Sequence, residues 1–310
     1  MKNIIKRERN KEIFPTLNPN NDTIIIEDGY KCLTYIPGNN IKITAKKEYF
    51  DSIIVDGEEK VNGESGILVI SNLLNPVVKV RFKEGISDLN YCFEDCTLTA
   101  ISSRLFDNCT KVTNFSGCFW NCNKLIEIPS GLFDNNPNVT NFSWCFHGCL
   151  SLTTIPSRLF DNCTKVIDFS YCFGNCINLT TIPSKLFDNC TNVDSFYCCF
   201  YNCFSLITIL FGLFDNNPNV TNFNSCFYNC SNLTTIPQDL FSNCTKVTKF
   251  NYCFSKCINL KVIPIDSDNT PIYNRSGKGK EGYSIVTSNN YCFNECTSIN
   301  NYTNIPKDWK

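Results

Sequence analysis

The sequence predicts a β-rich repeat solenoid that follows a small all-β module. A Cys-Phe-x-x-Cys pair recurs along most of the chain, and successive copies start 26 residues apart once, 27 residues apart five times and 39 residues apart once. A fixed period of this size indicates a solenoid, in which each unit packs only on its neighbours. The copies start at Cys92, Cys118, Cys145, Cys172, Cys199, Cys226, Cys253 and Cys292.

Each unit contains two similar halves, for example Leu105–Phe115 and Cys118–Pro129. Apolar residues stand three apart in both halves, as at Leu125 and Ile128, which favours a short, arched strand rather than a continued helix. Pro129 stops that strand, and the following Ser-x-Leu-Phe-Asp-Asn stretch has room for about one helical turn. We therefore expect right-handed coils of short strands and single helical turns, with columns of Phe, Leu and Ile inside.

Composition and charge exclude several classes of protein. The 310 residues carry a formal net charge of −1 and 18% charged residues, so no basic surface for nucleic acid is expected. No apolar run approaches the length of a membrane span, and the N-terminus lacks the apolar segment of a secretory signal.

Cysteine is abundant, with 22 residues, of which 20 fall in repeat columns. Asn136 and Asn217 replace Cys in one of these columns, which indicates a small, buried position rather than half of an obligatory bridge. Structural disulfides are the alternative. Zinc is disfavoured because the spacing is Cys-x-x-x-Cys and His147 is the only histidine, and we expect no metal or cofactor.

Asparagine also forms columns, which predict ladders of side-chain amides that satisfy backbone groups at the coil corners. The alternative for four of these residues is a glycan acceptor, because they stand in Asn-x-Ser/Thr sequences. The columns are Asn108, Asn135, Asn162, Asn189, Asn216 and Asn243, and Asn121, Asn175, Asn202 and Asn229; the four sequons start at Asn108, Asn162, Asn189 and Asn243.

Residues 1–70 read as a separate all-β module, and residues 71–310 read as the solenoid. Turns rich in Gly, Asp and Asn separate the short β-type runs of the module. Val78, Val80 and Phe82 alternate with charged residues, which predicts a strand covered on one face. Twelve extra residues within 265–290 predict a surface loop in the last repeat. The expected strands are Thr23–Ile26, Lys31–Ile36, Ile41–Ala45, Ser52–Val55 and Ile67–Ile70.

The junction Val78–Cys96 resembles one unit of the BspA-like leucine-rich repeats, whose tail reads V-x-x-I-x-x-x-A-F-x-x-C. Later units such as Leu152–Cys163 resemble the same family in a doubled, 27-residue form, and the likeness covers roughly 76–310. The residues that match the tail are Ile86, Leu89, Cys92, Phe93 and Cys96. The resemblance implies leucine-rich-repeat coils displayed on a bacterial, protist or phage surface, where they bind host or matrix components.

No constellation of catalytic residues interrupts the repeat, so we expect a binding or structural protein and not an enzyme. His147 stands in a column that also holds Trp120, Gly174 and Ser255, and this variety predicts an exposed, non-catalytic position.

Two variable columns beside the Cys-Phe pair hold many aromatic residues, which predict a binding surface for a glycan or a protein. The structural alternative is that these rings fold back and shield a coil edge. The candidate binding residues are Trp120, Trp144, Tyr171, Tyr201, Tyr228 and Tyr252, and Tyr291 stands in the same column as Tyr252.

The first expectation for the whole chain is a bacteriophage virion component of a fibre, tail or head decoration. Residues 1–70 then attach to other virion subunits or to a second copy, and the repeats contact a glycan or protein of the host surface. The alternatives are a bacterial cell-surface or extracellular adhesin and an intracellular interaction scaffold.

Overall fold

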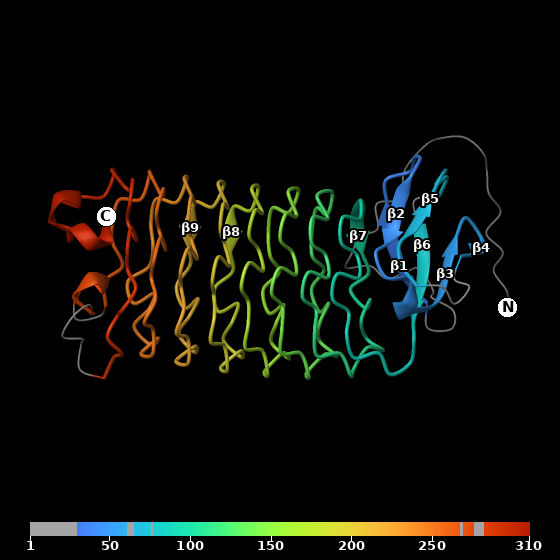
Figure 1. The fold of residues 1–310 in the computed structure, drawn as a ribbon, viewed down its shortest axis with the longest axis horizontal. Helices are drawn as coiled ribbons and strands as arrows, with labels where there is room; N and C mark the ends of the chain where they lie inside the picture. The colour runs from blue at the N-terminus through green and yellow to red at the C-terminus, as the bar shows by residue number, and fades with distance from the viewer. Residues whose placement is uncertain (1–29, 61–64, 76, 267–268, 276–281) are drawn as a thin grey trace.

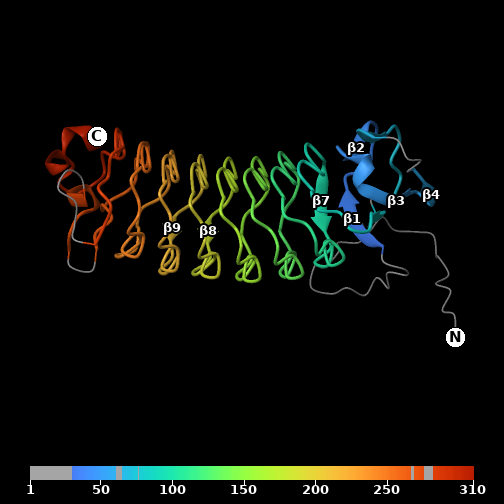
Figure 2. The same cartoon turned by 60° about the horizontal axis from the view of Figure 1, so that its bottom comes forward.

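The structure is a computed structural model that describes residues 30–60, 65–75, 77–266, 269–275 and 282–310. The chain forms one elongated stack of coils, with a β-sheet module at one end and a short C-terminal segment folded over the other (Figure 1). We number the coils 1 to 8 by the Cys-Phe pairs with which they begin, so that coil 1 starts at Cys92 and coil 8 at Cys292. Figure 2 shows the same stack from a second direction.

The N-terminal module contains a five-stranded antiparallel sheet of order β4-β3-β6-β1-β7 and a two-stranded pair of β2 and β5. Four of the five expected runs are strands, and Thr23–Ile26 lies outside the described residues. In β6, Val78 and Val80 are buried and Lys79 is exposed, as the alternation predicts. The bounds are β1 Lys31–Tyr35, β2 Ile41–Thr44, β3 Phe50–Val55, β4 Glu58–Glu59, β5 Leu68–Ile70, β6 Val77–Phe82 and β7 Leu98–Ile101, with a 3-10 turn η2 at Lys47–Tyr49.

The sheet continues past residue 70, because β6 and β7 both pair with β1 and β7 is already part of coil 1. Rings of the module also continue the core of the coils. Phe50 packs 5.9 Å from Phe93, and Phe82 packs 5.7 Å from Phe106, measured between ring centroids. The module therefore covers the first face of the stack.

Successive coils are joined by a ladder of parallel backbone hydrogen bonds. For example, the amides of Phe115, Gly117 and Phe119 donate to carbonyls of the next coil at 2.8–2.9 Å. Single parallel bridges repeat this pairing along the stack, from Asp88–Asn114 to Lys249–Ser288. Each coil thus satisfies the backbone groups of its neighbour, as buried polar groups require.

Regular strands are rarer in the coils than the sequence predicts. Past β7, the described coils contain only β8 at Thr181–Ile182 and β9 at Thr208–Ile209, with no α-helix. The other expected strands are reduced to single bridges, such as Asn141–Asp168. Residues in the left-handed region, such as Tyr171 (φ 58°) and Asn175 (φ 56°), lie in the turns between these stretches. The Leu-Phe-Asp-Asn stretch closes hydrogen bonds between residues three apart, such as Asp161 to Arg158, so the expected single turn is confirmed.

The core consists of three columns of phenylalanine rings that run the length of the stack. Rings within a column lie 5.3–6.1 Å apart and nearly parallel, and every one is buried. Leu and Ile columns fill the space between them, which confirms the predicted interior. The columns are Phe93, Phe119, Phe146, Phe173, Phe200, Phe227, Phe254 and Phe293; Phe106, Phe133, Phe160, Phe187, Phe214 and Phe241; and Phe115, Phe142, Phe169, Phe196, Phe223 and Phe250.

All 22 cysteines are buried free thiols, which confirms the prediction of reduced core cysteine. Burial raises their pKa values wherever a shift is resolved, for example to about 12 in Cys163 and Cys176. Asn136 and Asn217, which replace Cys in one column, face the same backbone carbonyls as the cysteines of that column. The Asn136 amide donates to the carbonyls of Phe106 and Cys109 at 3.2 and 3.0 Å, while the Cys163 sulfur lies 3.8–3.9 Å from the equivalent carbonyls.

The last coil is closed by the C-terminal segment. The Phe293 amide donates to the Trp309 carbonyl at 2.7 Å, which continues the ladder where a further coil would begin. The Trp309 ring is buried 6.1 Å from Phe250 and from Phe293. Three 3-10 turns belong to this end of the chain, η3 at Ile272–Arg275, η4 at Tyr302–Asn304 and η5 at Lys307–Trp309.

The Asn136 contacts give a direct test of the column. We expect Asn136→Ala to lower the free energy of unfolding by about 1–3 kcal/mol, because it removes the donor from two buried carbonyls. Asn136→Cys introduces the residue that the neighbouring coils have at this position and should lower the free energy of unfolding by less than Asn136→Ala does. Chemical denaturation measures both, and Asn135→Ala, at an exposed position next in the chain, is the control. Equal losses for Asn136→Ala and Asn135→Ala would contradict the assignment.

Candidate functional site

The predicted aromatic residues form a row of rings at one corner of the stack, which we call the aromatic ridge. Consecutive ring centroids lie 6.0 Å apart from Tyr91 to Trp120, 6.4 Å from Trp120 to Trp144 and 3.8 Å from Trp144 to Tyr171. The row continues over 6.3 Å to Tyr201 and 5.0 Å to Tyr228. The ridge is thus a connected row of six rings between the start of coil 1 and coil 6: Tyr91, Trp120, Trp144, Tyr171, Tyr201 and Tyr228.

Five of the six candidate binding residues belong to the ridge. Tyr252 lies outside it and forms a separate pair with Tyr291, with ring centroids 5.3 Å apart. Sequence reasoning missed Tyr91, which stands in the column of Trp144, and Tyr197, whose ring meets Tyr171 edge-on at 5.2 Å. The other aromatic residues in the column of Tyr91 could have indicated it. Tyr197 stands in a column of Ser and Asn, which contains no such indication.

Two of the glycines in the ridge columns are required by the rings beside them. A Cβ on Gly117 would lie 2.3 Å from the Tyr91 ring, and a Cβ on Gly174 would lie 2.7 Å from the His147 ring. Each glycine therefore leaves the space in which the ring of the preceding coil packs against the backbone. Packing therefore dictates the residue at these two positions.

His147 is buried beneath the ridge, so the prediction of an exposed position is wrong. Its ring packs 4.6 Å from Trp144, and the Asn175 amide donates to Nε2 at 3.0 Å. Burial lowers the pKa of His147 to about 4. The folded chain therefore keeps this ring neutral, and acid lowers the folding stability as the pH falls from 6.5 towards that value, because the unfolded chain takes up the proton first.

Several ridge residues hold a backbone conformation that disfavours a large side chain. Tyr91, Trp144 and Tyr171 have φ values of 52°, 62° and 58°, in the left-handed region. The same column holds Gly117 and Ser225, so the coil closes without an aromatic residue there. A left-handed residue with a side chain costs roughly 1–2 kcal/mol, and ring packing within the ridge offsets part of this.

A ladder of amide side chains lies beside the ridge. Asn229 donates to Asn202 and Asn202 donates to Asn175 at 3.0 and 2.9 Å. These amides pair with one another rather than with backbone groups, which corrects the prediction for this column. In the other column the prediction is confirmed, because Asn162 and Asn189 donate to backbone carbonyls of the preceding coil.

Charge is segregated around coils 3 to 6. The segments 143–157, 170–184, 197–211 and 224–238, which we call the uncharged side, contain no Asp, Glu, Lys or Arg. The intervening segments 158–169, 185–196, 212–223 and 239–250 contain 11 such residues. The central ridge residues from Trp144 to Tyr228 all lie on the uncharged side. A surface that a partner covers loses water from its charges, which is unfavourable unless they are paired, so interface centres are depleted of charge.

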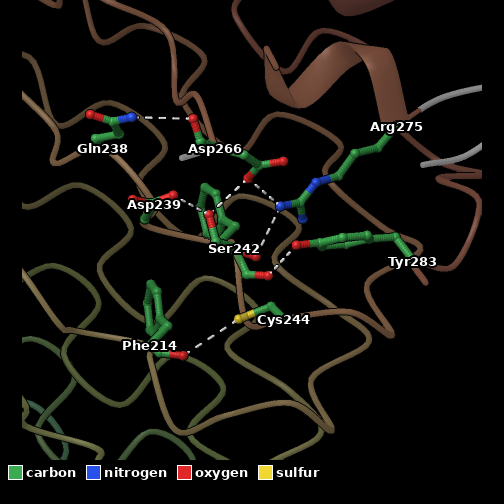
Figure 3. Close-up of polar contacts among 9 residues, drawn as sticks. Phe214, Gln238, Asp239, Ser242, Cys244, Asp266, Arg275 and Tyr283 are labelled. Carbon is green, nitrogen blue, oxygen red and sulfur yellow. Dashed lines mark hydrogen bonds and ion pairs between the residues drawn. The ribbon is translucent and has the colours of Figure 1, made fainter. Parts of the chain in front are cut away.

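A second polar cluster lies in coil 7, where the extra residues of the last repeat begin (Figure 3). Arg275 and Asp266 form a buried ion pair of 2.6 Å with side chains only 2% and 5% exposed. Arg275 also donates to the Phe241 carbonyl at 3.0 Å. In the preceding coil the Cys244 sulfur takes the same place on the Phe214 carbonyl. Arg275 therefore replaces a missing coil residue, and the cluster closes the stack.

No three His, Cys, Asp or Glu side chains are arranged to hold a metal ion in the part of the chain that the structure describes. The same part contains no helix long and apolar enough to cross a membrane.

The Arg275–Asp266 pair is expected to be essential for closing coil 7. Asp266→Asn leaves a buried guanidinium without its counter-charge and should lower the free energy of unfolding by about 3–5 kcal/mol. Asp161→Asn breaks a pair of the same length that Arg158 makes at the surface, 83% exposed, and should cost less than about 1 kcal/mol. Urea denaturation compares the two variants, and similar losses would show that Arg275 does not close the stack.

Comparison with known families identifies the repeat. The family model of the BspA type leucine rich repeat region matches residues 79–198 and 170–281 with six copies. These matches cover more than half of the chain, so the chain belongs to the BspA-type leucine-rich repeat family. The predicted family resemblance is confirmed.

Solved structures of two bacterial proteins are similar to the chain, each at 18% sequence identity. A leucine-rich repeat protein from Bacteroides ovatus matches over 80% of both chains with a TM-score of 0.18. A leucine rich cell surface protein from Faecalibacterium prausnitzii matches over 71% of this chain and 83% of its own, with a TM-score of 0.16. No protein with a curated description matches the sequence.

Proposed function

We propose that the chain is a non-enzymatic binding protein of a bacterial cell surface or extracellular space, and that its aromatic ridge contacts a glycan or a protein. The observation that carries this proposal is the position of the central ridge residues, from Trp144 to Tyr228, on the uncharged side. Trp144 and Tyr171 occupy left-handed positions that Gly and Ser also fill, so the fold alone does not require these side chains. The partly exposed Trp and Tyr rings suit a sugar ring or the centre of a protein interface. Among the described residues, the one charged group that lies over a ridge ring is Lys256, whose ammonium lies 5.6 Å from the centroid of the Tyr228 ring.

The family favours the bacterial surface over the virion as the place of action. The two similar solved proteins are leucine-rich repeat proteins of bacteria, and one of them is described as a cell surface protein. Nothing in these comparisons supports a virion role, so the bacterial alternative becomes the proposal.

The same proposal includes a role for residues 1–70 and the handedness of the coils. Residues 1–70 serve attachment or oligomerisation while the repeats are displayed, since the module covers one end of the stack and leaves the coils accessible. The coils are right-handed, because connections between parallel strands are right-handed in the great majority of proteins.

Replacing Trp120, Tyr201 and Tyr228 together with Ser tests the ridge. We expect binding to host cells or to a glycan array to fall at least about tenfold, or roughly 1.4 kcal/mol, because the variant removes three ring contacts. Circular dichroism and thermal unfolding establish that the coils still form. The matched control replaces Lys165 and Lys246, on the charged segments, with Ser and should leave binding unchanged.

Unchanged binding by the ridge variant would contradict a binding role for the ridge. Loss of the fold would assign the rings to shielding the coil edge, the structural alternative. Loss of binding in the Lys165 and Lys246 control would show that the contact surface lies on the charged segments.

A further inference from the structure

Coils 5 and 6 carry the same two residues at neighbouring positions of the ridge. Both coils begin Cys-Phe-Tyr-Asn-Cys, so Tyr201 and Asn202 of coil 5 correspond to Tyr228 and Asn229 of coil 6. Each of the other six coils has a different pair of residues at these positions. All four side chains are half-buried, and we call the four residues the tandem site.

The two halves of the tandem site lie side by side in register. The rings of Tyr201 and Tyr228 have centroids 5.0 Å apart and planes only 7° from parallel. The Asn229 amide donates to the Asn202 side-chain oxygen at 3.0 Å. The site therefore presents two equal sets of polar groups, one coil apart along the axis of the stack.

The stack explains the asparagines of the site better than it explains the tyrosines. Asn202 and Asn229 have φ values of 58° and 57°, in the left-handed region that Asn tolerates better than most residues. Coil 7 has Ser255 in the column of Tyr201 and Tyr228, so a coil closes without a ring there. The two stacked rings cover each other's facing surfaces, and what they offer to a ligand is their edges and hydroxyl groups.

Each hydroxyl group of the site has a hydrogen-bond donor beside it. The Asn202 amide lies beside the Tyr201 hydroxyl, and the Lys256 ammonium lies beside the Tyr228 hydroxyl. A phenol that accepts from such a donor still has its own O–H to donate. Asn202 donates once and accepts once within the amide ladder, and its oxygen has a second lone pair. The site can therefore both donate to a ligand and accept from it.

We infer that the tandem site binds a linear polysaccharide that runs along the axis of the stack, with successive sugar units on the two Tyr-Asn pairs. This inference rests on the proposed function of the ridge and names the class of its ligand. Two equal sets of donors and acceptors fit a ligand whose own polar groups repeat, and a linear polysaccharide repeats its hydroxyl groups at every sugar. The length of one sugar unit in an extended chain is also close to the interval between these coils.

A protein segment fits the spacing less well. Groups on one side of an extended strand repeat at every second residue, about 6.6 Å apart, whereas the two Tyr rings are 5.0 Å apart. A helix advances about 5.4 Å per turn, but its backbone groups are bonded internally and its side chains need not repeat.

The charges at this end of the ridge favour a neutral polysaccharide. Lys256 and Glu295 have opposite signs and attract each other, so they give no excess charge that would select an acidic or a basic ligand.

Titration calorimetry of the full chain with neutral β-1,4-linked hexasaccharides of glucose, mannose and xylose tests the inference. At least one hexasaccharide should bind, and at least about tenfold more tightly than its monosaccharide, because it occupies both halves of the site. The double variant Tyr201→Phe and Tyr228→Phe removes the two hydroxyl groups and keeps the stacked rings. It should bind the hexasaccharide at least about tenfold more weakly.

The matched control is the double variant Tyr252→Phe and Tyr291→Phe. It removes the hydroxyl groups of a second stacked pair, with centroids 5.3 Å apart, that lies outside the ridge. This control should bind the hexasaccharide as tightly as the natural sequence does.

Failure of all three hexasaccharides to bind overturns the inference. Equal affinity of the natural sequence and the Tyr201→Phe, Tyr228→Phe variant also overturns it, because the hydroxyl groups then make no contact with the sugar. If that variant still binds host cells while the Ser variant of the ridge does not, the ridge binds a partner through its rings alone. The proposed function then stands, and only the polysaccharide is excluded.

Discussion

The fold depends on contact between neighbouring coils. The apolar surface that one coil of 27 residues buries by itself does not offset the conformational entropy of ordering it, so a coil is stable only between neighbours. Two interactions cross each junction, the ladder of backbone hydrogen bonds and the stacked Phe columns. Both repeat at the same positions in each coil, which explains why the period is constant from Cys118 to Cys253.

The same constraint divides the positions of each coil into two kinds. Inward positions are tied to the coils on both sides, and a change in one coil disturbs two junctions. Outward positions are free to vary, and there the chain places residues that the stack does not require. The partly exposed rings of the aromatic ridge occupy such positions, whereas Gly117 and Gly174 in the same columns are fixed by the rings beside them. The closure at Arg275 and Trp309 ends the series without leaving a ladder edge exposed, as natural proteins do for open β edges.

The repeat made the interior predictable from the sequence. Because Asn136 and Asn217 replace Cys without changing their neighbours, comparison between repeats indicated small, buried positions without disulfides. The same comparison failed where one coil depends on the shape of the next. His147 looked exposed because its column is varied, yet Gly174 in the following coil provides the space that buries it.

Other features lay outside the reach of repeat comparison. The left-handed turn residues are set by the path of the backbone, since Tyr, Trp, Ser and Cys all occupy one such column. The pairing of β7 with β1 joins coil 1 to a module that has no repeat. Arg275 belongs to the extra residues of the last repeat, so no equivalent residue could indicate its role. The exposed apolar side chains of Leu210 and Phe211 are visible in the sequence, where they replace the Pro183-Ser184 of the preceding coil.

Deleting one whole coil is the most direct test of the dependence between coils. Removal of residues 158–184 joins Ser157 to Lys185 in register, and the shortened chain should unfold cooperatively in a thermal melt followed by circular dichroism, at a lower Tm. Removal of 158–171, about half a coil, brings unlike halves together at the junction and should abolish the cooperative transition. If both deletions melt alike, or if the whole-coil deletion is unfolded, neighbour contact in a fixed register is not what holds the chain together.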